Sequence, residues 1–165
     1  MNAVRNLSLS KIKPLYDKLV DWIAIMLVSV ITVVTSYQVF SRFVLNYTPA
    51  WTEELARFLL IWLVFIGSVI AYRKGSHLSV DFFLSLLPPR IMRIGMVLIH
   101  LISLTLIIAL IIAGAKMLPV GGDKFSPGMK LSMFYPYLAV YLGGILLFIE
   151  NITHLFTTMF LFKER

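Results

Sequence analysis

Residues 91–115 read IMRIGMVLIHLISLTLIIALIIAGA, and after Arg93 this stretch contains no Lys, Arg, Asp or Glu. A helix of about 20 mostly apolar residues crosses the roughly 30 Å hydrocarbon core of a bilayer, because a helix satisfies its backbone polar groups internally. The whole chain is similar in character: 59% of its 165 residues are apolar and 14% are charged. An ordinary soluble domain is about 45–50% apolar and about 25% charged. These values exclude a water-soluble protein and predict a helical membrane protein.

Three further stretches are long and apolar enough to cross a bilayer. They lie at about 22–45, 55–72 and 131–156, so 91–115 is the third of four spans. The first follows a basic segment but is longer than the apolar core of a signal peptide, so we expect it to be retained. The sequence therefore predicts an all-α integral membrane protein in which residues 1–165 form a single membrane domain of four transmembrane helices.

A shorter apolar segment separates the second and third spans. Residues 79–87 read SVDFFLSLL, which is too short to cross, and Pro88 and Pro89 end it. Its large apolar side chains recur at helical spacing. We expect a short interfacial amphipathic helix.

Basic residues define the expected orientation. Positively charged loops stay in the cytoplasm. Basic residues precede the first span and lie at both ends of the loop between spans two and three. They are Arg5, Lys11, Lys13, Lys18, Arg73, Lys74, Arg90 and Arg93. The loop between spans three and four has fewer, at Lys116, Lys124 and Lys130. Both termini are therefore expected in the cytoplasm. A positive net charge of +7 fits anionic lipid rather than nucleic acid, because the cations lie between apolar runs.

A cluster of charges lies at the expected outer ends of spans one and two. It consists of Arg42, Glu53, Glu54 and Arg57. Both acids lie three or four residues before Arg57, at the spacing of helical ion pairs. We expect the four residues to form an interhelix charge clamp or a surface for partner docking. An ion or substrate site is the alternative, since charges at membrane depth are costly and often functional.

Two histidines and one acid lie deeper in the expected spans. His100 and His154 fall at similar depth, and an imidazole pair from two helices is a known haem ligand set. More often a membrane histidine hydrogen-bonds a neighbouring helix. Glu150 is four residues before His154 and is the one plausible proton-carrying acid within the spans. A haem-bearing redox anchor and a proton-coupled exporter are therefore the alternative functions. The chain has no cysteine and no recognisable metal, nucleotide or nucleophile motif, so we expect neither an enzyme nor a cofactor.

Small residues mark places where helices can approach closely. Gly67 and Ala71 form a small-xxx-small pair, and Gly143 and Gly144 interrupt the fourth span.

The stretch from 40 to 88 resembles the small membrane subunit of tripartite ATP-independent periplasmic (TRAP) transporters. The resemblance rests on FSRF at 40–43, WTEELAR at 51–57, HLSVD at 77–81 and the closing Leu87-Pro88. The chain also has the length and four-span plan of that subunit.

The resemblance implies a multi-pass protein of the bacterial inner membrane that works with a large membrane subunit and a periplasmic substrate-binding protein, contacted directly or indirectly. In such systems the large subunit carries the substrate and sodium sites and moves elevator-fashion, while the small one is a scaffold. The substrates are organic anions such as C4-dicarboxylates or sialic acid. His77 and Asp81 would belong to a cytoplasmic connector motif. The residues themselves agree on one point: the spans offer no clear cationic site for a carboxylate near mid-membrane.

Overall fold

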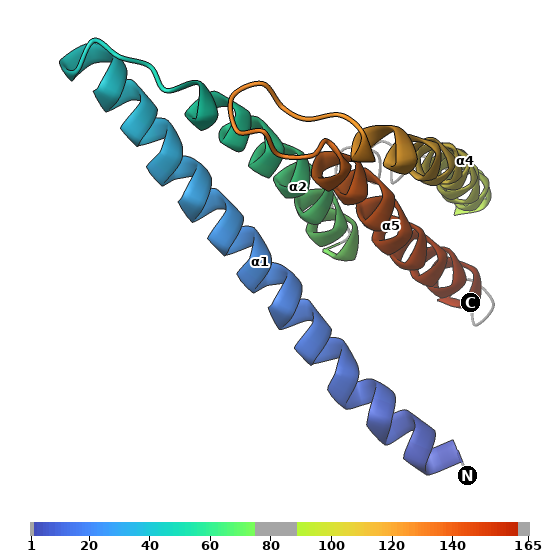
Figure 1. Ribbon diagram of the computed structural model, residues 1–165. Helices are drawn as coiled ribbons and strands as arrows, with labels where there is room; N and C mark the ends of the chain where they lie inside the picture. The colour runs from blue at the N-terminus through green and yellow to red at the C-terminus, as the bar shows by residue number, and fades with distance from the viewer. Residues whose placement is uncertain (1, 75–88, 162–165) are drawn as a thin grey trace.

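The computed structural model describes residues 2–74 and 89–161, and these residues form four helices. The helices are α1 (Asn2–Val44), α2 (Ala50–Arg73), α4 (Pro89–Gly122) and α5 (Phe134–Leu161) (Figure 1). Each contains a segment long and apolar enough to cross a membrane. The predicted all-α membrane fold is confirmed. The expected interfacial helix at 79–87 lies outside the described residues.

Each helix contains most of one predicted span and extends beyond it at one end or both. The largest extension is in α1, which begins at Asn2 rather than near residue 22. At 1.5 Å per residue its 43 residues measure about 65 Å, roughly twice the thickness of the hydrocarbon core. Hydropathy detects only the part of a helix that favours lipid, whereas backbone hydrogen bonding continues past that part.

The glycine pair of α5 makes this helix the centre of the fold. A Cβ atom at Gly143 would lie 2.5 Å from Cβ of Phe65 on α2, and one at Gly144 would lie 2.8 Å from Cγ1 of Ile111 on α4. The missing side chains therefore let α2 and α4 approach α5 on two sides, as the sequence predicts. By contrast, a Cβ at Gly67 would meet nothing within 4 Å.

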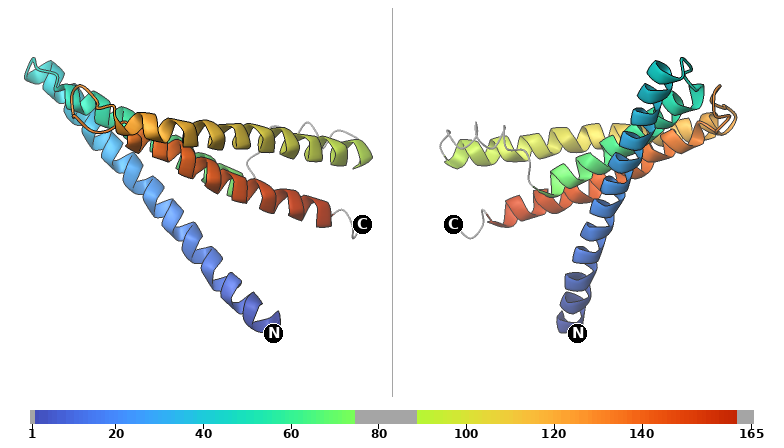
Figure 2. Two further views of the ribbon diagram at one scale, coloured as in Figure 1. Left: turned by 45° about the vertical axis from the view of Figure 1, so that its right-hand side comes forward. Right: turned by 90° about the vertical axis from the view of Figure 1, so that its left-hand side faces the viewer.

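Helix α1 is held differently from the other three. Among the described helices it packs mainly along α2, while α5 packs closely against both α2 and α4. Figure 2 shows α1 diverging from α4 and α5 toward its N-terminus. Near the middle of α1, Val20 packs with Ile66 and Val69 of α2, and Leu146 of α5 lies against this cluster. The fold is thus an open frame, with much of the surface of α1 exposed.

The frame has two distinguishable ends. The connections 45–49 and 123–133 lie together at one end, which we call the loop end. The first residues of α1 and the last residues of α5 lie toward the other end, which we call the terminal end (Figure 1).

Candidate functional site

The first turns of α2 carry three of the four predicted site residues. Glu53 Oε1 accepts a hydrogen bond from Arg57 Nη2 at 2.9 Å. This is the expected i,i+4 ion pair within one helix. Both side chains are about two-thirds exposed, at 64% and 66%, so the pair contributes little to stability.

Glu54 joins α2 to the connection between α4 and α5. Its carboxylate accepts three hydrogen bonds of 2.8 Å: from the Ser126 hydroxyl, from the Gly128 N–H and from the Met129 N–H. A Cβ atom at Gly128 would lie 3.0 Å from the Glu54 carboxyl group, so glycine permits the close approach. The Glu54 carboxylate is therefore hydrogen-bonded to the loop between α4 and α5 rather than paired with a basic side chain.

The loop that Glu54 holds is itself ordered by backbone contacts. The N–H of Ser126 donates to the Leu131 carbonyl, and the N–H of Met133 donates to the Lys124 carbonyl, both at 2.8 Å. Ser126 is buried, whereas the side chain of Phe125 is 65% exposed. The loop therefore has an ordered backbone and exposes the Phe125 ring at the loop end.

Arg42 does not join the acids of α2. In the described part of the chain, the ion pairs are those of Arg57 with Glu53 and of Arg73 with two aspartates. The Arg42 guanidinium instead lies 6.0 Å from the centre of the Phe43 ring. At this end Ser41 of α1 holds the 45–49 connection, because its hydroxyl donates to the Tyr47 carbonyl at 2.6 Å. The clamp or docking role of the four charges stays a prediction.

An ion-pair link between α1 and α2 lies near the terminal end. Arg73 donates from Nη1 to Asp17 Oδ1 at 3.1 Å and from Nη2 to Asp21 Oδ1. The Arg73 side chain is only 12% exposed, so this link is better shielded from solvent than the Glu53–Arg57 pair. Sequence reasoning missed it. The available signal was the i,i+4 spacing of two acids just before the first span, with an arginine at the end of the second.

Buried polar side chains of α5 form a second set of polar contacts near the terminal end. Asn151 is fully buried and donates from Nδ2 to the Tyr72 hydroxyl at 2.7 Å. The ring of His154 lies edge-on to that of Tyr72, with 6.1 Å between ring centres. Glu150 is also buried, and Tyr16 of α1 lies beside it. Glu150 and His154 lie four residues apart on α5, but the two side chains form no ion pair.

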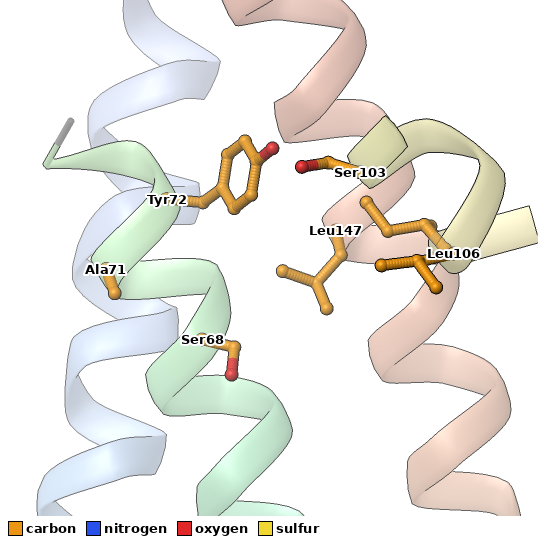
Figure 3. A pocket seen from close by; sticks show the side chains of 7 residues that line it. Ser68, Ala71, Tyr72, Ser103, Leu106 and Leu147 are labelled. Carbon is orange, nitrogen blue, oxygen red and sulfur yellow. The ribbon is translucent and has the colours of Figure 1, made fainter. Parts of the chain in front are cut away.

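A cavity of about 370 Å³ opens next to the Tyr72 ring (Figure 3). It is lined by side chains from three helices: Ser68, Ala71 and Tyr72 of α2, Ser103, Leu106 and Ile107 of α4, and Leu147 of α5. The lining is mostly apolar. The predicted connector residues His77 and Asp81 lie outside the described part of the chain. Within the described ranges no three His, Cys, Asp or Glu side chains are grouped as a metal site would require.

Residues 31–160 match the family model for the DctQ component of tripartite ATP-independent periplasmic transporters. A protein from Haemophilus influenzae named as a TRAP transporter small permease is 28% identical over 148 residues, covering 87% of this chain and 89% of the relative. The sialic acid TRAP transporter small permease SiaQ of Vibrio cholerae is 24% identical over 154 residues, covering 93% and 88%. The isethionate TRAP transporter permease DctMQ of Oleidesulfovibrio alaskensis is 28% identical over 92 residues, which are 54% of this chain and 14% of that protein. The chain therefore belongs to the DctQ family, the small permease component of TRAP transporters.

Proposed function

We propose that this chain is the scaffold subunit of a transporter whose large, elevator-type membrane subunit carries out sodium-driven uptake of an organic anion. A periplasmic binding protein delivers the anion. Both termini of the chain face the cytoplasm, so the loop end faces the periplasm. Arg42, Glu53, Glu54 and Arg57 lie on that side, where they shape the surface that the partners meet.

The placement of the described arginines carries the proposal. A carrier of organic anions needs a fixed cation or an open helix terminus near mid-membrane. Arg42 and Arg57 lie at the loop end, and Arg73 lies near the terminal end with two aspartates around it. None of these three arginines is therefore placed to bind an anion at mid-membrane, which favours a supporting role.

The large surface of the chain supports a role within a bigger assembly. Its accessible surface is 11708 Å². A compact chain of 18.8 kDa exposes about 8,300 Å². The accessible surface therefore exceeds that of a compact chain by about 3,400 Å². This excess is larger than the total surface that two proteins bury in an interface of standard size. Because α1 is long and packs weakly on the other helices, it leaves surface free for contact with a partner. This suits a subunit that enlarges the stationary scaffold of the large membrane subunit.

The relatives support the partner and the substrate class. The match to DctMQ covers only 14% of that protein, so a segment similar to this chain there belongs to a much longer permease polypeptide. Sialic acid and isethionate, which appear in the names of two relatives, are both organic anions. We infer an organic anion as the substrate, with C4-dicarboxylates and sialic acid as the first candidates to assay.

Reconstitution in liposomes tests whether uptake requires both membrane subunits. Liposomes would contain this chain, the large subunit, or both, with the binding protein and labelled anion outside and an inward sodium gradient. We expect uptake only when both membrane subunits are present. Uptake by this chain alone, or full-rate uptake by the large subunit alone, would overturn the proposal.

A further inference from the structure

The cavity beside Tyr72 lies within the apolar segments of three helices. All of its lining residues belong to helix segments that are long and apolar enough to cross the bilayer. Within the described chain α2 and α4 each pack on α5 but do not contact one another. The cavity therefore lies between two helices that leave a gap, with Leu147 of α5 between them (Figure 3).

The size of the cavity suits a single hydrocarbon chain. A methylene group is about as large as a water molecule, whose share of liquid volume is about 30 Å³. A space of about 370 Å³ therefore has room for roughly a dozen such groups, which is the larger part of one fatty acyl chain. Bulky side chains such as Leu106 and Ile107 supply the apolar contacts that such a chain would make.

An exposed cation lies near the cavity, at the end of α2. Ser68 and Ala71 line the cavity, and Lys74 follows Ala71 by three residues at the end of α2. Residues three apart are neighbours on a helix surface, so Lys74 adjoins Ala71 at the edge of the cavity. Lys74 is exposed, and its N–H still donates to the Ile70 carbonyl at 3.0 Å, so the helical turn continues to this residue. Its ammonium group can thus reach an anionic phosphate at the edge of the bilayer.

We propose that the cavity between α2, α4 and α5 binds one acyl chain of a phospholipid whose phosphate pairs with Lys74. Lipid tails are as apolar as leucine, so the acyl chain gains little by leaving the bulk bilayer. Selective retention therefore depends on the fit of the chain to the cavity and on the phosphate–ammonium pair together. This inference concerns the chain alone and is independent of its proposed function.

Native mass spectrometry of the full chain, extracted in mild detergent, tests the proposal. We expect one phospholipid to remain bound to the wild type. Ser103→Phe places a ring in the cavity and should reduce the lipid-bound fraction about tenfold. The matched control is Ser29→Phe, on an exposed site of α1 where the hydroxyl bonds only to the Ile25 carbonyl of its own helix. Equal retention by the two variants would overturn the proposal.

A second variant tests the headgroup without disturbing the packing. Lys74→Gln removes the cation and should lower lipid retention severalfold, whereas Lys130→Gln, an exposed lysine of the loop end, should leave it unchanged. Equal loss in both variants would contradict a specific phosphate site. A photoreactive residue at position 103 distinguishes the source of the occupant in the assembled transporter. Labelling of phospholipid supports the proposal, and labelling of the large subunit instead would overturn it.

Discussion

The contact between Gly143 and Phe65 gives a sharp prediction about what holds the frame together. An added Cβ at Gly143 would lie 2.5 Å from Phe65 Cβ, whereas non-bonded carbons are most stable at about 3.5–4.0 Å. In Gly143→Ala, α2 and α5 must therefore separate by about 1 Å, and overpacking of this kind costs about 1–3 kcal/mol. Replacing glycine by alanine within a helix also gains up to about 1 kcal/mol.

Gly67→Ala is the matched control, because it gains the same helix propensity and meets no atom within 4 Å. The difference between the two variants therefore isolates the packing cost, about 2 kcal/mol. At about 2–4 °C per kcal/mol for a chain of this size, Gly143→Ala should denature about 4–8 °C below Gly67→Ala. Thermal denaturation of the purified proteins in detergent, followed by tryptophan fluorescence, measures this difference. Equal midpoints within about 1 °C would refute the close α2–α5 contact.

Three further predictions concern the charges and the orientation. Glu54→Gln should speed hydrogen exchange at the Gly128 and Met129 amides severalfold, because a neutral amide is a weaker acceptor, while Glu53→Gln should not; equal rates in both variants would contradict the role of Glu54. Arg73→Ala should destabilise the chain by about 1–3 kcal/mol, less than a fully buried pair because both aspartates are partly exposed, and an unchanged denaturation midpoint would argue against the link. Fusions of alkaline phosphatase should be inactive at the C-terminus and active in the 123–133 loop, and the reverse pattern would invert the orientation.

The sequence was informative where a feature depends on local pattern. Apolar runs locate the four helices, and the Gly143–Gly144 pair marks the close approach of helices, since both features need only neighbouring residues. The start of α1 at Asn2 is different, because residues before the apolar run are helical without being lipid-compatible. Hydropathy carries no information about such a segment.

The polar contacts depend on partners that are distant in sequence. Glu54 accepts hydrogen bonds from backbone N–H groups more than 70 residues away. The spacing of charges in a sequence cannot predict a contact with a backbone donor. The partners of Arg73 are more than 50 residues away on α1. A charge motif suggested pairing between Arg42 and the acids of α2, but the distance between helix ends depends on how the 45–49 connection turns. That turn is fixed by Ser41 and by Thr52, whose hydroxyl donates to the Pro49 carbonyl at 2.7 Å.

The central claim is that this chain works as one subunit of a larger membrane transporter. Its most direct test is purification of the tagged chain from its own host in mild detergent, followed by mass identification and an absorption spectrum. We predict that a large multi-span permease co-purifies in a fixed ratio and that no haem absorbance accompanies it. Recovery of the chain without any such permease, or with a haem-containing redox enzyme, would contradict the account.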